Sequence, residues 1–165
     1  MSRVSHVSAG STPEESELVA GIRARRGGKL LNLDRVLLNS PPFARGWNAH
    51  LGAVRQDLAL EPKLRELAVC AVAVLNGAEY EFEQHEPEWR GAGATEAQVI
   101  ALRQLAPGVI PAEFDEVEAG VLQLTVEMTR AVKVREATFE RVRTLLQDER
   151  RVVELVGVIA TYNMV

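Results

Sequence analysis

The stretch KLRELAVCAVAVLNG, residues 63–77, decides the fold because it is apolar at almost every position beyond Glu66. A helix that is apolar on nearly all sides is buried in the middle of a protein. Asn76 and Gly77 then stop the helix. The stretch therefore predicts a central helix in an all-α fold.

The segment after this helix, AEYEFEQHEPEWRGAG at 78–93, is acidic and has helical spacing. Pro87 lies two residues past His85, and proline removes a helical hydrogen bond, so we expect this helix to be kinked or split there. Thr95 has the character of an N-cap. It predicts another short helix within ATEAQVIALRQL at 94–105.

Helices are also predicted before the central one. Residues 1–10 are small and polar without periodicity, and we interpret them as a flexible tail. Thr12 then has the place of an N-cap, with Pro13 at the first helical position and Glu15 placed to close a capping box. Two glycines end this helix, and the stretch LDRVLLN predicts a short helix over 33–39.

A longer helix is predicted to start at Ser40, Pro41 and Pro42, because apolar residues recur after them at helical spacing. His50 lies on the same stripe, and a histidine in this position is most simply interpreted as packed in the core. The stripe consists of Phe43, Trp47, Leu51, Val54 and Leu58.

The chain beyond the APGVIP loop has helical patterning over 112–133, 136–147 and 150–165, and strand alternation is nowhere convincing. We therefore expect one all-α domain over residues 11–165. Its helices carry more apolar surface than one small bundle hides, and the last one ends without a cap. Either the native chain continues or this end packs against something, and self-association is expected.

Composition narrows the function classes. The 165 residues are 47% hydrophobic and 25% charged, with a net charge of -4, which is ordinary for a globular protein. The one basic cluster, RARRGGK at 23–29, closes a predicted helix, so no nucleic-acid partner is expected. No stretch has the length and apolar character of a signal-peptide core or a membrane span, so we expect a cytoplasmic protein without a membrane partner.

Glu66 is the first candidate for chemistry, because its helical neighbours Val69, Cys70 and Ala73 are all apolar. Burial disfavours the charged form of a carboxyl group and raises its pKa toward the range useful for general acid or base catalysis. The alternative is that Glu66 lies at the wet end of its helix and pairs with Arg65, Lys63 or a neighbouring helix.

His85 is the second candidate, because it shares a helical face with Phe82 and Trp89 and lies one turn after Glu81. A carboxylate at that spacing can orient an imidazole and stabilise its protonated form. The alternative is an ordinary surface ion pair between Glu81 and His85.

Metal binding is only weakly indicated. The glutamate and histidine spacing of di-iron bundles is absent, and so is HExxH, so no metal is expected. Cys70 is the only cysteine, which excludes a disulfide or a cysteine-based zinc site within one chain. We interpret Cys70 as a small buried hydrophobe.

The core of the chain, about residues 33–103, resembles the carboxymuconolactone decarboxylase and alkylhydroperoxidase D superfamily. The resemblance is carried by an apolar helix that begins LRE and leads through a glycine into an acidic helix that ends at a histidine, followed by a GAT turn. It implies an all-α, alkylhydroperoxidase D-like helical bundle that assembles into a homotrimer or homohexamer, with the site near a subunit interface.

The two branches of this superfamily differ in their thiols. The peroxidase branch has a glutamate and a histidine at the positions of Glu66 and His85, but its two cysteines correspond to Ala78 and Glu81 here. A thiol peroxidase cannot work without that pair. The decarboxylase branch needs no cysteines, and its pattern matches Gly77, Glu79, Glu81 and His85, with Tyr80 where that branch often has a histidine.

The sequence thus predicts a cysteine-independent acid/base enzyme, most simply a decarboxylase acting on a small carboxylated lactone or carbonyl metabolite, without a cofactor. His85, Glu66 and Glu81 are the expected catalytic residues. The alternatives are a peroxidase-related oxidoreductase and a non-catalytic ligand-binding oligomer. The candidate substrate-binding residues are Tyr80, Arg65, His50 and Trp89.

Overall fold

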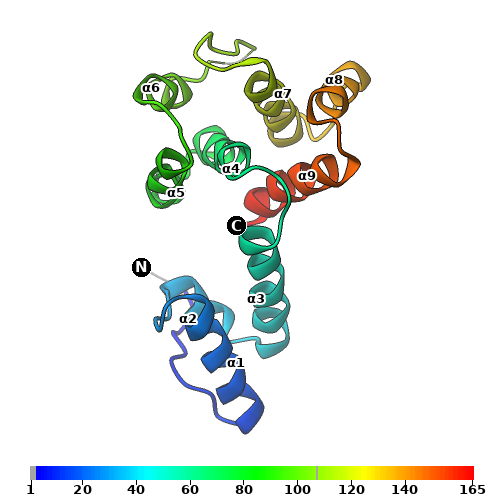
Figure 1. Ribbon diagram of the computed structural model, residues 1–165. Coiled ribbons are helices and arrows are strands. Elements are labelled where there is room, and N and C mark those ends of the chain that lie inside the picture. Colours follow the sequence, from blue (N-terminus) through cyan, green and yellow to red (C-terminus); the bar gives the residue numbers. More distant parts are fainter. Residues whose placement is uncertain (1–2, 107) are drawn as a thin grey trace. The chain divides into compact units, whose positions relative to one another are not determined.

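The structure is a computed structural model that describes residues 3–106 and 108–165. Within these ranges the chain forms nine α-helices and no strand, so the predicted all-α fold is confirmed (Figure 1). Pro107, in the predicted loop, lies outside the described residues, as do the first two residues of the predicted tail. The helices are α1 (Pro13–Arg25), α2 (Asn32–Leu37), α3 (Pro41–Gln56), α4 (Pro62–Asn76), α5 (Glu79–Gly91), α6 (Glu96–Arg103), α7 (Glu116–Arg130), α8 (Glu136–Leu146) and α9 (Glu149–Met164).

The chain divides into two compact units, Met1–Asp57 and Leu58–Val165. The single domain over 11–165 stays a prediction. Among the described residues, none of the helices combines the length and apolar character needed to cross a bilayer.

The first unit contains α1, α2 and α3. The Thr12 hydroxyl accepts a hydrogen bond from the Glu15 backbone N–H, which confirms the predicted N-cap, while the Glu15 carboxylate accepts from the backbone N–H of Ser11. Residues 3–10 form no helix, but the Val7 N–H donates to the Arg35 carbonyl at 3.0 Å. The core of this unit consists of Leu18, Val19, Ile22, Leu38 and Ala44.

His50 is exposed on α3, so the interpretation of this residue as a packed core histidine was wrong. The buried stripe of α3 runs through Ala44, Trp47, Leu51 and Val54. These residues recur at spacings of three and four, so they share one face of the helix. His50 lies beside that face, on the solvent side.

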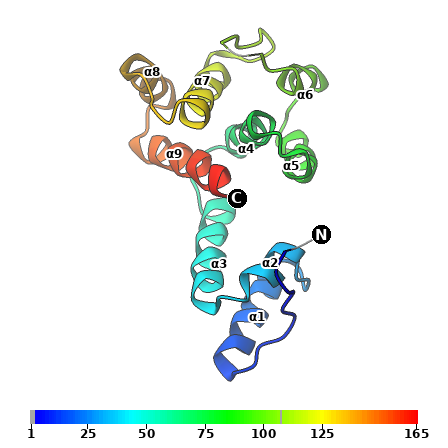
Figure 2. The ribbon, with the colours of Figure 1, turned by 180° about the vertical axis from the view of Figure 1, so that it is seen from behind.

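In the second unit, α4 is the central helix, as predicted. Its residues from Leu67 to Ala73 are all buried, and it packs against α5, α6, α7 and α9. Figures 1 and 2, which view the molecule from opposite sides, both show α4 between α5 and α6 on one side and α7 and α9 on the other. Side chains on α4 can therefore meet partners from four helices.

Gly77 turns the chain from α4 into α5. It adopts a left-handed conformation with φ of 67°, which glycine reaches without a steric cost. The Ala78 N–H donates to the Ala73 carbonyl at 2.8 Å and so closes the helix end. The next helix runs unbroken from Glu79 to Gly91, so it is not split at Pro87. A proline in this position removes one N–H donor, and the flanking turns of the helix remain.

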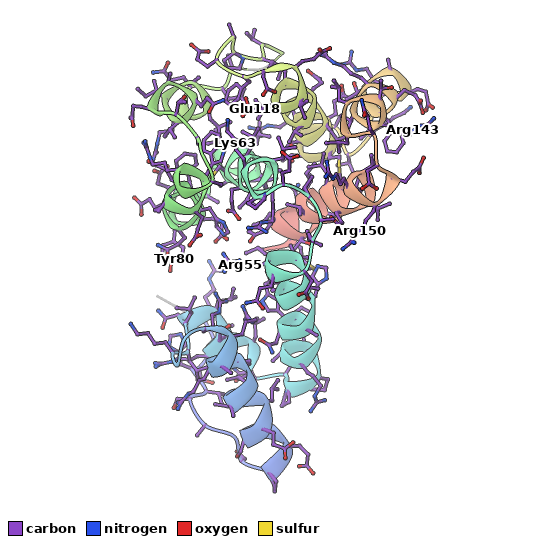
Figure 3. All side chains as sticks on the ribbon, in the orientation of Figure 1. Arg55, Lys63, Tyr80, Glu118, Arg143 and Arg150 are labelled. Atoms are coloured by element: carbon purple, nitrogen blue, oxygen red, sulfur yellow. The ribbon has the colours of Figure 1, made fainter. Side chains whose placement is uncertain are left out.

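Helix α7 starts later than predicted, at Glu116 instead of residue 112. The side chain of Asp115 accepts from the Glu118 N–H and caps the helix, so the preceding residues are outside it. The Glu118 carboxylate also lies 2.7 Å from Lys63 Nζ and accepts a hydrogen bond from Gln98 (Figure 3). This carboxylate therefore joins α4, α6 and α7.

A second carboxylate joins α7 to α8. Glu127 accepts hydrogen bonds from the backbone N–H of Arg135 and from the Thr138 hydroxyl, both at 2.8 Å. These bonds and those from the Arg135 and Gln123 side chains outweigh the effect of burial and lower the pKa of Glu127 to about 2.

Candidate active site

Three ionisable side chains of the second unit meet around one imidazole. Glu66 comes from the first half of α4, and Glu81 and His85 lie one turn apart on α5. The tight turn at Gly77 brings α5 back along α4, so that Glu66 faces His85. The two helices pack closely, which places this meeting point in the interior.

The imidazole of His85 lies between two carboxylates. Its Nδ1 atom is 2.6 Å from Glu66 Oε2, and its Nε2 atom is 3.3 Å from Glu81 Oε1. His85 is 1% exposed and Glu66 is 5% exposed, whereas the Glu81 side chain is 25% exposed. The alternative of an ordinary surface ion pair therefore does not fit His85, and Glu81 is the member of the cluster that reaches toward solvent.

Arg65 completes the cluster. Its Nε atom donates to Glu66 Oε1 at 3.0 Å, so the two oxygens of Glu66 are engaged by Arg65 and His85 respectively. Burial alone raises the pKa of the Glu66 carboxyl, but the hydrogen bonds and charges of His85 and Arg65 outweigh it and hold this pKa below its ordinary value. The expectation of a raised Glu66 pKa was therefore wrong, because it considered burial without these partners.

The proton arrangement follows from the two carboxylates. A carboxylate oxygen accepts hydrogen bonds, so the hydrogen bond between Nδ1 and Oε2 requires a proton on His85 Nδ1 or on Glu66, and Nε2 can carry a second proton toward Glu81. A short, charge-assisted contact of this kind lets a proton shift between the two groups with little movement. The cluster can thus hold a proton in the interior and release it through Glu81.

A cavity of about 160 Å³ adjoins this cluster. It lies between α4, α5 and α9, and Glu81 belongs to both the cavity wall and the cluster. The ring of Tyr162, also in the wall, contacts His85 edge-on with a centroid distance of 5.0 Å. The cavity is lined by Val69, Val72, Ala73, Asn76, Ala78, Tyr80, Glu81, Tyr162 and Val165.

The part of the chain that contains this site is similar to known proteins. Residues 41–121 match the model of the carboxymuconolactone decarboxylase family. The match covers 81 of the 165 residues, so this region of the chain is similar to that family. No curated protein matches the chain. The fold is similar to that of an uncharacterized peroxidase-related protein from Silicibacter sp. TM1040, solved by crystallography, with a TM-score of 0.74 and 19% identity over 98% of this chain and 84% of that chain.

The match to the carboxymuconolactone decarboxylase family model agrees with the resemblance found in the sequence. The structure also shows where the residues lie that replace the two cysteines. Ala78 and Glu81, which occupy the two cysteine positions of the peroxidase branch, both line the cavity. Cys70 is fully buried within α4, and burial, followed by the charge of Glu66, raises the pKa of its thiol. The interpretation of Cys70 as a buried hydrophobe is confirmed.

The candidate substrate-binding residues fall in different places. Tyr80 lies on the first turn of α5 (Figure 3). It is 65% exposed and belongs to the cavity wall. Arg65 is held by Glu66. Trp89 is completely buried and stacks on Phe114 at 6.4 Å, and it is not part of the cavity wall. His50 lies in the other unit, on α3.

Two residues of the cavity wall, Tyr162 and Asn76, were missed by the sequence reasoning. Asn76 was interpreted only as a helix stop. Tyr162 lies on the last helix, and no spacing rule links it to His85, because the contact depends on how α9 packs on α4. Within residues 3–106 and 108–165, no group of three or more His, Cys, Asp and Glu side chains is arranged to hold a metal ion.

Proposed function

We propose that this protein is a cysteine-independent acid/base enzyme that transfers a proton to or from carbon in a small carbonyl-bearing metabolite. One observation carries the proposal: a buried histidine lies between two carboxylates, one of which also lines a cavity. Catalytic acids and bases need such a paired environment, together with access to the substrate.

The three residues have different parts in this proposal. Glu81 meets the substrate in the cavity, because it is the cluster member in the cavity wall. His85 passes a proton to or from Glu81 across 3.3 Å. Glu66 and Arg65 fix the ring of His85 and balance its charge from the far side. A proton that Glu81 takes from the substrate passes to Nε2 of His85 while that nitrogen is unprotonated, and it returns to the substrate by the same route.

Decarboxylation of a lactone acid, the simplest reading of the sequence, stays a prediction. An anionic substrate needs a countercharge, and Arg65, the one cation among the candidate substrate-binding residues, donates to Glu66 instead. A thiol-dependent peroxidase has less support, because Cys70 is buried and its pKa is raised. Exchange of carbon-bound hydrogen is therefore the better first assay.

The test is deuterium exchange in D₂O, followed by NMR over a panel of small ketones, lactones and keto acids. For any compound that exchanges, His85→Gln should lower the rate by about 100-fold to 10,000-fold. His50→Gln is the matched control, because it removes an exposed histidine from the other unit. Full activity in a folded His85→Gln variant would overturn the proposal, and so would an equal loss in both variants.

A further inference from the structure

The size of the cavity restricts its ligand. An apolar protein cavity of about 150 Å³ holds a benzene molecule, and the cavity beside His85 measures about 160 Å³. Tyr80 and Val165 in its wall are both exposed, so the rim is open to solvent. The cavity therefore accepts one six-membered ring with a small substituent.

The wall of the cavity is mostly apolar. Three valines, two alanines and two tyrosine rings make up most of it, and Asn76 and Glu81 add polar groups. Asn76 is held in place, because its side-chain amide donates to Asn163 Oδ1, and Asn163 in turn donates to the Thr129 hydroxyl. Among the described residues of the wall there is no lysine or arginine. A ligand thus finds an apolar surface with two fixed polar groups.

The charged groups beside the cavity leave no excess positive charge. Arg65 is one cation and Glu66 and Glu81 are two carboxylates, so the charges balance only when both ring nitrogens of His85 carry a proton. A carboxylate placed in the cavity would approach Glu81 without a lysine or arginine in the wall to offset the repulsion. An ammonium group would compete with His85 for Glu81 and break the existing pair.

We infer that the cavity beside Glu81 binds an uncharged, ring-sized molecule with one carbonyl or amide-like polar group, and that it discriminates against both carboxylates and cations. The inference rests on the proposed function, because it names the class of substrate for the same site. It narrows the substrate to a neutral cyclic carbonyl compound and excludes the free lactone acid.

Three probes of the same shape test the inference at pH 7: benzamide, which is uncharged, benzoate, which is anionic, and benzamidinium, which is cationic. Their affinities are measured by NMR titration of the wild-type protein. Benzamide should bind at least about tenfold more tightly than either charged probe, which corresponds to about 1.4 kcal/mol. Tighter or equal binding of benzoate or benzamidinium, or no binding of any probe, overturns the inference.

Two substitutions, each with a matched control, locate the binding. Ala78→Leu adds bulk at the exposed rim of the cavity and should abolish benzamide binding, while Ala97→Leu on the exposed face of α6 should not. Glu81→Gln should reduce the preference for benzamide over benzoate, and Glu83→Gln, an exposed glutamate on the same helix, should leave it unchanged. An unchanged affinity in Ala78→Leu, or an unchanged preference in Glu81→Gln, overturns the inference.

Failure of this inference is distinguishable from failure of the proposed function. The probe titrations measure binding without turnover, and the exchange assay measures turnover with and without His85. Exchange of a keto acid that depends on His85, together with tight benzoate binding, contradicts the substrate class alone.

Discussion

Nδ1 of His85 and Oε2 of Glu66 lie 2.6 Å apart in the interior of the second unit, where both side chains are almost fully excluded from water. A buried pair of this kind tolerates the loss of one partner poorly, because the charge that remains has no compensation. The same contact therefore supports the fold and the proposed chemistry. Substitutions must be judged by both stability and turnover.

Glu66→Gln should destabilise the protein at pH 7 by about 3 kcal/mol, because it leaves His85 and Arg65 without their carboxylate. The lowered pKa of Glu66 also makes the stability of the folded state depend on pH. The carboxylate stabilises the folded state above its ordinary pKa of 4.5, and this contribution is lost as the pH falls through the lower folded value.

The measurement is urea denaturation between about pH 3 and pH 7, where wild type should lose stability toward acid more steeply than Glu66→Gln. Glu83→Gln is the control, because it removes an exposed carboxylate two residues before His85. Identical acid profiles for wild type and Glu66→Gln would contradict the assigned pKa direction.

Cys70→Ala should retain the activity of the wild type, because Cys70 is buried in α4 and is not part of the cavity wall. A thiol reagent should label the wild-type protein only after unfolding, since burial raises the pKa of the thiol and blocks access to it. Loss of activity in a folded Cys70→Ala variant would restore the thiol mechanism.

Glu127→Gln should lower the free energy of unfolding at pH 7 by about 2 kcal/mol, because the carboxylate holds the start of α8 through Arg135 and Thr138. With a folded pKa of about 2 against an ordinary value of 4.5, this contribution is present above pH 4.5 and disappears as the pH falls toward 2. Glu116→Gln on the same helix, whose carboxylate is exposed, should cost less than about 0.5 kcal/mol.

Arg103→Met should loosen the acidic helix. The guanidinium of Arg103, on α6, donates to Glu79 and Glu86 and lies 4.1 Å from the centre of the Phe82 ring, so it holds α5 at three points. We expect the free energy of unfolding to fall by about 1 kcal/mol and amide hydrogen exchange within α5 to become faster. Arg143→Met, in a more exposed pair with Glu140, should change neither quantity measurably.

Assembly into a homotrimer or homohexamer stays a prediction from the sequence and the family. Light scattering at micromolar concentration should give a mass of three or six times the 18.1 kDa chain. A monomer at that concentration would remove the subunit interface from any account of the site.

The helices, and the choice of Glu66 and His85 as candidate residues, were open to prediction for different reasons. Thr12 and Thr95 cap their helices through local hydrogen bonds, which sequence spacing reveals directly. Glu66 and His85 were named as catalytic candidates from their helical neighbours and from the resemblance, but the contact between them was not predicted, because no local rule states that α5 returns along α4. Asp115 and Glu118 have the spacing of a capping box. This local signal indicates where α7 begins, and the sequence analysis did not use it.

Other features depend on how the helices pack, so they could not be predicted from the sequence. The pKa direction of Glu66 follows from two hydrogen bonds that form only in the folded protein. The exposure of His50 depends on which side of α3 faces its core. The place of Tyr162 depends on the docking of α9 against α4, and contacts between segments so far apart in sequence have no local signal.

Gly77 also influences the order in which the protein folds. It joins α4 to α5 through a tight turn, so that Glu66 and His85 are separated by only 19 residues in the chain. Closing a short loop costs little chain entropy, and helical hairpins therefore form early. We expect the hairpin of α4 and α5 to be structured in the transition state for folding and α9 to dock afterwards. The acid and the imidazole would then meet first, and the aromatic wall supplied by Tyr162 would close over them last.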